Sequence, residues 1–209
     1  MERDGESARI RLDARNLRGI AHPARVRILD MLRTDGPATA SSLARRLGMN
    51  TGATSYHLRQ LAGHGFIADI PGRGIRRERW WQAAHWNTAF PEDELLRDDS
   101  GLGAAYLRSV VQVRADSMLA AADATPALPQ EWRSAQDFSD YLFNLTPAQA
   151  ADLGAEIHAV LRRHQATDLR TLQQVSEGAA RVTFQFQMFP NSDDLSPREA
   201  AADDDDDHR

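Results

Sequence analysis

Side chains suited to contact with nucleic acid cluster between residues 51 and 79. Hydroxyl, amide, imidazole and guanidinium groups, which hydrogen-bond to base edges or phosphates, gather on one expected helix: Thr51, Ser55, Tyr56, His57, Arg59 and Gln60. A second group consists of guanidinium groups that suit a DNA backbone or minor groove: Arg73, Arg76, Arg77 and Arg79. A solvated hairpin tip is the alternative for the second group. Their closeness in sequence favours one surface that binds double-stranded DNA.

Individual roles follow from side-chain chemistry. Arg59 can donate two hydrogen bonds to a guanine, a contact worth about 1–3 kcal/mol of discrimination between bases. Thr51, at the start of its helix, can donate to a phosphate beside the positive end of the helix dipole. For His57 two interpretations stay open, a phosphate contact or a histidine packed against the next helix.

Two short helices precede these residues. Proline in the first turn and apolar residues at helical spacing predict a helix from Pro23 to about Gly36. Thr39 can cap a second helix, which Gly48 ends by adopting a left-handed backbone.

The third helix begins after the cap Asn50 and buries Thr54, Leu58 and Leu61 on one face. The pattern then changes period, so residues 66–70 and 76–81 are expected to form two strands joined by the turn-forming run 71–74. Helix, turn, helix and hairpin in this order predict a winged helix-turn-helix. Because side chains alternate along a strand, either Arg77 with Arg79 or Arg76 with its neighbours can face inward against Trp80 or Trp81. The sequence does not decide between these two orientations.

The run 54–67 resembles the ArsR-type winged-helix transcriptional regulators. Ser55, His57 and Leu58 give the family pattern Ser-x-His-Leu, and a leucine, a glycine and an apolar pair follow at the family spacing. The upstream run 21–29 matches the opening of the family's first motif helix, so the resemblance covers about residues 12–84. It implies a dimeric repressor or activator whose third motif helix enters the major groove, with the wing on the flanking backbone.

Charge divides the chain into two halves. Residues 1–90 hold fifteen arginines and eight acidic residues, a net charge of +7, whereas residues 91–209 hold ten arginines and twenty-two acidic residues, a net charge of −12. A basic N-terminal half suits attraction to DNA. The chain has no cysteine, which excludes disulfides and thiolate metal sensing. No long apolar run or signal peptide is present, so we expect a cytoplasmic protein without a membrane partner.

A helix is expected from Gly101 to about Asp123, with Tyr106, Val110 and Val113 on its apolar face. The resemblance implies that this helix and residues 13–20 form a homodimer interface. Packing within one chain explains the amphipathic pattern equally well.

The C-terminal part carries two further patterns. Thr146, Pro147 and Gln149 predict a capped helix, and strict alternation over residues 181–189 predicts a strand. With a weaker strand over 138–145, these elements would form a small β-α-β unit. Its aromatic side chains are interpreted first as core and second as a pocket for an apolar small-molecule effector, lined by Trp132, Phe184 and Phe186.

The expected fold class is mainly α with small β (α+β). The expected divisions are a disordered N-terminus (1–11), the winged helix (12–90), a connector with the dimerisation-type helix (91–124), a C-terminal α+β domain (125–190) and a disordered acidic tail (191–209). The run of five aspartates in the tail serves solubility or, alternatively, competes with DNA for the wing.

Catalytic, metal and cofactor sites are not expected. His158 and His164 are six residues apart, which places them on opposite faces of a helix, and no nucleophile or phosphate-loop motif occurs. The sequence therefore predicts a homodimeric, sequence-specific transcriptional regulator, most simply a repressor, on an inverted-repeat operator. The alternative is a winged-helix protein-interaction module, against which the polar face of the third helix argues.

Overall fold

A computed structural model describes residues 9–72, 78–89, 100–164 and 177–195. The chain divides into two compact units, which are described separately. Unit 1 comprises Met1–Leu142 and His164–Arg181, and unit 2 comprises Phe143–Arg163 and Val182–Arg209.

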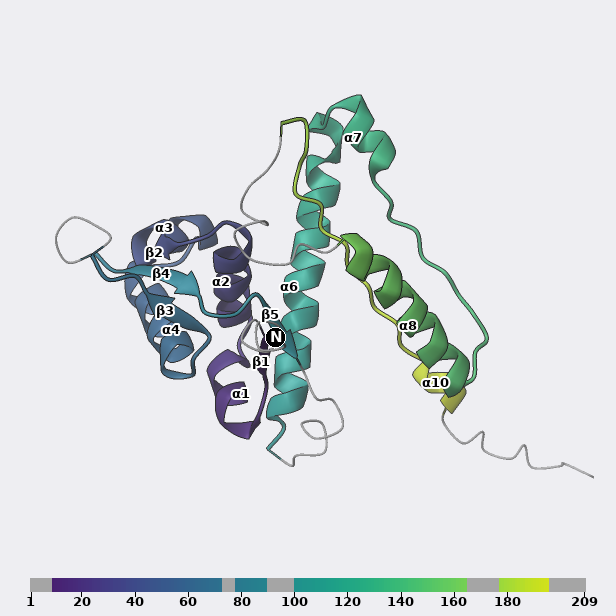
Figure 1. The fold of residues 1–209 in the computed structure, drawn as a ribbon, viewed down its shortest axis with the longest axis horizontal. Coiled ribbons are helices and arrows are strands. Elements are labelled where there is room, and N and C mark those ends of the chain that lie inside the picture. The colour runs from purple at the N-terminus through teal and green to yellow at the C-terminus, as the bar shows by residue number, and fades with distance from the viewer. Residues whose placement is uncertain (1–8, 73–77, 90–99, 165–176, 196–209) are drawn as a thin grey trace, which may run out of the picture. The chain divides into compact units, whose positions relative to one another are not determined.

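Unit 1 is mainly helical with two small sheets (Figure 1). Its elements are β1 (Arg9–Arg11), α1 (Ala14–Ile20), α2 (Pro23–Thr34), β2 (Ala38–Thr39), α3 (Ala40–Leu47), α4 (Thr51–Gly63), β3 (Ile67–Asp69), β4 (Trp80–Ala83), β5 (Asn87–Ala89), α6 (Leu102–Ala124), the 3₁₀ turn η1 (Thr125–Ala127) and α7 (Gln130–Ala135). The expected α+β class is confirmed, and the three helices of the predicted motif are α2, α3 and α4.

The turn between α3 and α4 is fixed by local hydrogen bonds. Thr39 and Ser42 form a reciprocal capping box at the start of α3, and Gly48 ends that helix in the left-handed region at φ 63°. Asn50 caps α4, its Oδ1 accepting the Ala53 N–H at 2.7 Å. The caps predicted from sequence therefore set the angle at which α4 leaves the turn.

Strands β2, β4 and β3 form an antiparallel sheet beside this motif. The two hairpin strands differ from the predicted ones. Strand β3 is shorter and ends at Asp69, and strand β4 begins later than predicted, at Trp80. Part of the expected loop and second strand, residues 73–77, lies outside the described residues.

Strand β1 pairs in parallel with β5, with Ile10 opposite Thr88. The expectation of a disordered stretch through residue 11 is therefore wrong for residues 9–11. Three residues are too few to show a strand period, and their partner lies almost eighty positions further along the chain.

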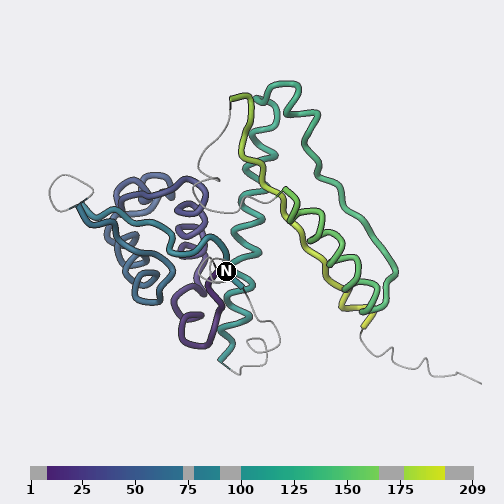
Figure 2. Tube along the Cα trace, viewed as in Figure 1, coloured from purple at the N-terminus to yellow at the C-terminus, as the bar shows by residue number. Residues whose placement is uncertain are grey.

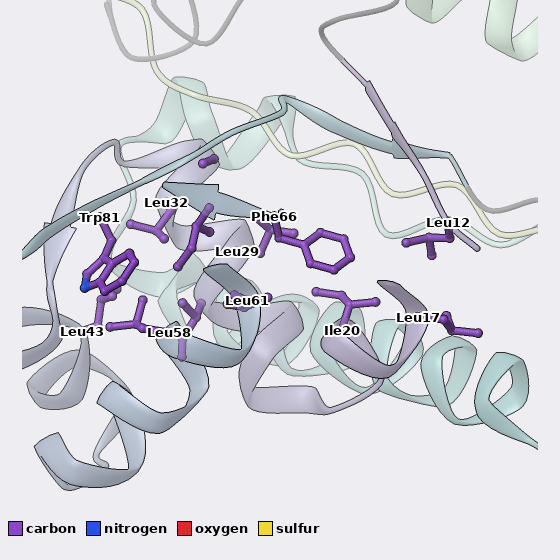
Figure 3. Packing of buried hydrophobic residues seen from close by; sticks show 13 residues of the cluster. Leu12, Leu17, Ile20, Leu29, Leu32, Leu43, Leu58, Leu61, Phe66 and Trp81 are labelled. Atoms are coloured by element: carbon purple, nitrogen blue, oxygen red, sulfur yellow. The ribbon is translucent and has the colours of Figure 1, made fainter. Parts of the chain in front are cut away.

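A continuous apolar core joins the motif helices to the sheet (Figure 3). Leu58 and Leu61 of α4, Leu43 of α3 and Phe66 are fully buried, and Trp81 of β4 packs into the same cluster. Burial of the predicted stripe, including Thr54, is confirmed. The opposite side of α4 is therefore left to face solvent.

Helix α6 packs against α1 and α2 along the face predicted to be apolar. Val113 and Ser109 are buried, and Tyr106 packs against the main core. An ion pair between Arg27 and Asp116 at 3.4 Å also links α2 to α6. The expected helix over 101–123 is confirmed as α6.

Unit 2 contains α8 (Pro147–His164) and the short α10 (Ser192–Leu195). The predicted cap is present, since the Thr146 N–H donates to Gln149 Oε1 at 2.9 Å. The extended segment 182–189 runs beside α8 (Figure 2), with the His158 and Phe186 rings 6.0 Å apart.

The predicted β-α-β unit is wrong, because residues 138–145 and 181–189 form no strand. Alternating side chains indicate an apolar face, but a strand also requires a neighbouring chain to complete its hydrogen-bond ladder. Within the described ranges, no helix has the length and apolar character needed to cross a membrane.

Candidate nucleic-acid interface

Helix α4 presents most of the predicted contact residues on its solvent side. Thr51, Tyr56 and Arg59 are exposed, and Ser55 and Gln60 are partly exposed. Their placement follows from the burial of Thr54, Leu58 and Leu61, which fixes the rotation of the helix about its axis.

Helix α4 borders an open depression of about 550 Å³ together with the wing and the start of α3. Its lining residues are Ala40, Ser41, Ser55, Arg59, Glu78, Arg79 and Trp81. Residues from the two groups predicted from sequence, Ser55 and Arg59 on the helix and Arg79 on the wing, thus share one groove. A base edge or phosphate entering it would meet donors from both elements.

The Arg59 side chain is partly oriented by its own helix. Its Nε donates to the Ser55 carbonyl oxygen at 3.2 Å. This bond holds the side-chain stem along the helix surface, and the terminal nitrogens keep the planar fork that suits bidentate recognition of guanine.

His57 lies on the other side of α4 and is only 8% exposed. Its ring centroid is 4.7 Å from that of His22, the N-cap of α2, and 5.6 Å from that of Tyr56. Burial lowers the pKa of His57, and the positive charges of His22 and Arg25 lower it further. The burial of the ring agrees with the packed-histidine interpretation, and the phosphate contact of the other interpretation stays a prediction.

Arg25 was missed in the sequence analysis. It is partly buried on the first turn of α2, and its Nε is buried without a hydrogen-bond partner in the part of the chain that the structure describes. Burial lowers its pKa, opposed by the neighbouring Tyr56. Its position three residues after the cap His22 was the available signal, but a helix-start arginine is common and does not identify its neighbour on α4.

Arg33, near the end of α2, makes two hydrogen bonds to the segment that follows β4. Its Nε donates to the His85 carbonyl oxygen and its NH2 group to Thr88 Oγ1, both at 2.8 Å. Burial lowers the pKa of Arg33 to about 10. The two bonds connect α2 to the chain that leaves the wing.

The remaining predicted residues lie elsewhere. Arg73, Arg76 and Arg77 fall outside the described residues. Trp132 lies on α7 in unit 1, whereas Phe184 and Phe186 belong to unit 2. Across the described ranges, no three His, Cys, Asp or Glu side chains are grouped as a metal site would require.

Residues 20–70 match the family described as "Helix-turn-helix domain". The comparison with curated proteins gave no match. The match covers the three motif helices and β3, so this part of the chain is similar to that family, and in the structure β4 pairs with β3 beyond the matched residues.

Solved structures with likeness to the chain include HlyU from Vibrio cholerae N16961, at 25% identity over 40% of this chain and 80% of HlyU, with a TM-score of 0.30. Another is the homodimeric winged helix-turn-helix DNA-binding domain of a possible ArsR-family regulator from Mycobacterium bovis, at 27% identity over 51% of this chain and 80% of that chain, with a TM-score of 0.31. A mutant MarR from E. coli in complex with operator DNA is 18% identical over 70% of this chain and 84% of that chain, with a TM-score of 0.29.

Proposed function

We propose that this chain is a sequence-specific, DNA-binding transcriptional regulator of the ArsR type. The observation that carries the proposal is the groove that Ser55 and Arg59 of α4 line together with Arg79 of the wing. A helix with exposed polar side chains beside a basic wing suits simultaneous contact with the major groove and the flanking backbone. The net charge of +7 on residues 1–90 attracts the phosphates.

The exposed side of α6 supports a homodimer. Leu107, Val111 and Met118 are 44%, 51% and 51% exposed, and their spacing places them on one face of the helix. This apolar stripe is separate from the face that Tyr106 and Val113 turn to the core. A second copy that buries the stripe would bring two α4 helices to one duplex with two-fold symmetry, and a bound dimer would repress by occupying its operator.

Arg59→Ala and Arg79→Ala test the DNA-contact roles. Arg59→Ala should relax preference at one base pair of each half-site, a loss of about 1–3 kcal/mol of discrimination. Arg79→Ala should weaken all duplexes alike and reduce the salt dependence of log K by about one unit per lost phosphate contact. Fluorescence anisotropy at several salt concentrations measures both effects, with Arg162→Ala on α8 as the control for charge loss.

Val111→Asp tests the homodimer. A carboxylate in the centre of this exposed stripe would be buried in the proposed dimer interface, and it should shift the protein from dimer to monomer because burying an unpaired charge costs several kcal/mol. Sedimentation equilibrium measures the mass, and Arg108→Asp on the same helix is the exposed control. If the wild-type chain sediments as a monomer at micromolar concentration, the proposed homodimer is refuted.

Arg59→Ala and Arg79→Ala proteins that bind DNA as the wild type does would refute the proposed contacts. The alternative function, a protein-interaction module, would then explain the domain better.

A further inference from the structure

A compact cluster of positive and titratable groups lies where the start of α2 meets α4. It consists of His22, Arg25, Tyr56 and His57, and is called the α2–α4 cluster below. His22 and His57 are in ring contact, and so are Tyr56 and His57. The cluster thus combines two imidazoles, a guanidinium and a phenol beside the exposed face of α4.

Among the described residues, the α2–α4 cluster has no carboxylate as a counterpart. In the described part of the chain, the groups that act electrostatically on His57 are His22 and Arg25, and the group that acts on Arg25 is Tyr56; no carboxylate does so. No ion pair to Arg25 occurs among the described residues either. A partly buried guanidinium without a carboxylate is costly unless an anion completes it.

Two buried nitrogens of the α2–α4 cluster also lack a hydrogen-bond partner among the described residues. They are Arg25 Nε, a donor, and His57 Nδ1, which donates when the imidazole is protonated. His22 Nδ1 accepts the Ala24 N–H at 3.1 Å, so the hydrogen of the neutral ring is on Nε2, where it can be donated. An oxyanion satisfies such a set of groups, because it accepts several hydrogen bonds and neutralises the charge at the same time.

The position of the cluster identifies the anion. Tyr56 belongs both to the cluster and to the solvent face of α4, where it is 53% exposed. A duplex lying along that face carries a phosphate every few ångströms, so a backbone phosphate can reach the cluster while bases meet Ser55 and Arg59.

We infer that the α2–α4 cluster binds a phosphate of the DNA backbone and that this binding is coupled to protonation of His57. This inference rests on the proposed DNA-binding function and adds to it a phosphate site outside the groove and a dependence on pH. A phosphate beside the imidazole favours its charged form, so the complex takes up a proton that the free protein lacks.

The coupling predicts opposite effects of acid on folding and on binding. In the free protein, burial and neighbouring charge disfavour the protonated imidazoles, so acidification destabilises the fold. In the complex, the phosphate favours protonation, so acidification strengthens DNA binding by at most about tenfold per pH unit for one proton. A histidine that only packs in the core would show the first effect and not the second.

The first experiment uses sulfate as the probe and needs no DNA. Histidine titrations are followed by NMR on the full chain, with and without sodium sulfate at matched ionic strength. Sulfate should raise the titration midpoint of His57 in the wild type and in Arg162→Gln, and leave it unchanged in Arg25→Gln. Equal midpoints with and without sulfate in the wild type would overturn the anion site, whatever the protein's function.

The second experiment measures affinity for duplex DNA between pH 6.0 and 7.5. The wild type and His158→Gln should bind more tightly at pH 6.0, and His57→Gln should lose that dependence. If a Gln variant fails to fold, Arg25→Lys replaces it. This variant keeps the positive charge and should retain part of the pH dependence of DNA binding. A sulfate effect without a pH effect on DNA binding would leave the anion site standing and refute its use by DNA. An equal pH dependence in wild type and His57→Gln would refute the proton coupling.

Discussion

Replacing Gly19 by alanine should destabilise unit 1, although alanine is the better helix former. Gly19 is buried on α1 and lies directly against His64, the residue that ends α4. A Cβ at this position would lie 2.6 Å from His64 Cδ2 and closer still to its Cβ and Cγ. The glycine therefore permits the close approach that fixes the end of α4 against α1.

Two opposing effects decide the magnitude. Alanine gains about 1 kcal/mol over glycine inside a helix. Overpacking in a closed contact costs about 1–3 kcal/mol, and the upper end applies because His64 Cβ is attached directly to the backbone and cannot swing away. The net loss is about 2 kcal/mol, or roughly 4–8 °C in Tm for a unit of this size.

Thermal unfolding followed by tryptophan fluorescence measures this loss, since all four tryptophans belong to unit 1. Gly63→Ala is the matched control, because an added Cβ on that α4 residue meets nothing within 4 Å and should be neutral or stabilising. Gly19→Ala combined with His64→Ala should recover part of the loss. A Gly19→Ala protein at least as stable as the wild type would refute the close packing of α1 against α4.

Two further predictions concern stability. Arg33→Lys should lower the free energy of unfolding by about 1–3 kcal/mol, because a single ammonium cannot reach both the His85 carbonyl and the Thr88 hydroxyl as the guanidinium does. Urea unfolding measures this loss, and an unchanged midpoint would contradict the two-bond geometry. Because burial lowers the pKa values of His22 and His57 in the folded protein, the unfolded chain binds more protons just below its ordinary histidine pKa of about 6.5. Stability should therefore be full above that pH and decrease on acidification below it, and urea midpoints of His57→Gln that fall as steeply as those of the wild type would contradict this origin.

The motif helices and their caps could be predicted from sequence because local signals dominate there. Asn50 caps α4 and Gly48 closes α3 through hydrogen bonds within a few residues, and such bonds leave a mark on the sequence. The rotation of α4, and with it the exposure of Tyr56 and Arg59, followed from the apolar stripe alone.

The features that were missed depend on partners distant in sequence. Strand β1 exists because β5 pairs with it, and the segment 181–189 lacks a strand because no chain completes its ladder, although its alternation is perfect. The electrostatic effect of Arg25 on His57 of α4 likewise depends on how two helices pack together. Periodicity describes the face of an element but not what lies opposite it.

The most direct test of the DNA-binding proposal is selection from a pool of random duplexes with the full-length protein at moderate salt. The wild type should enrich an inverted repeat with half-sites about one helical turn apart, and Arg59→Ala should lose preference at one base pair per half-site in the same selection. Failure of the wild-type protein to enrich any sequence would contradict the proposal.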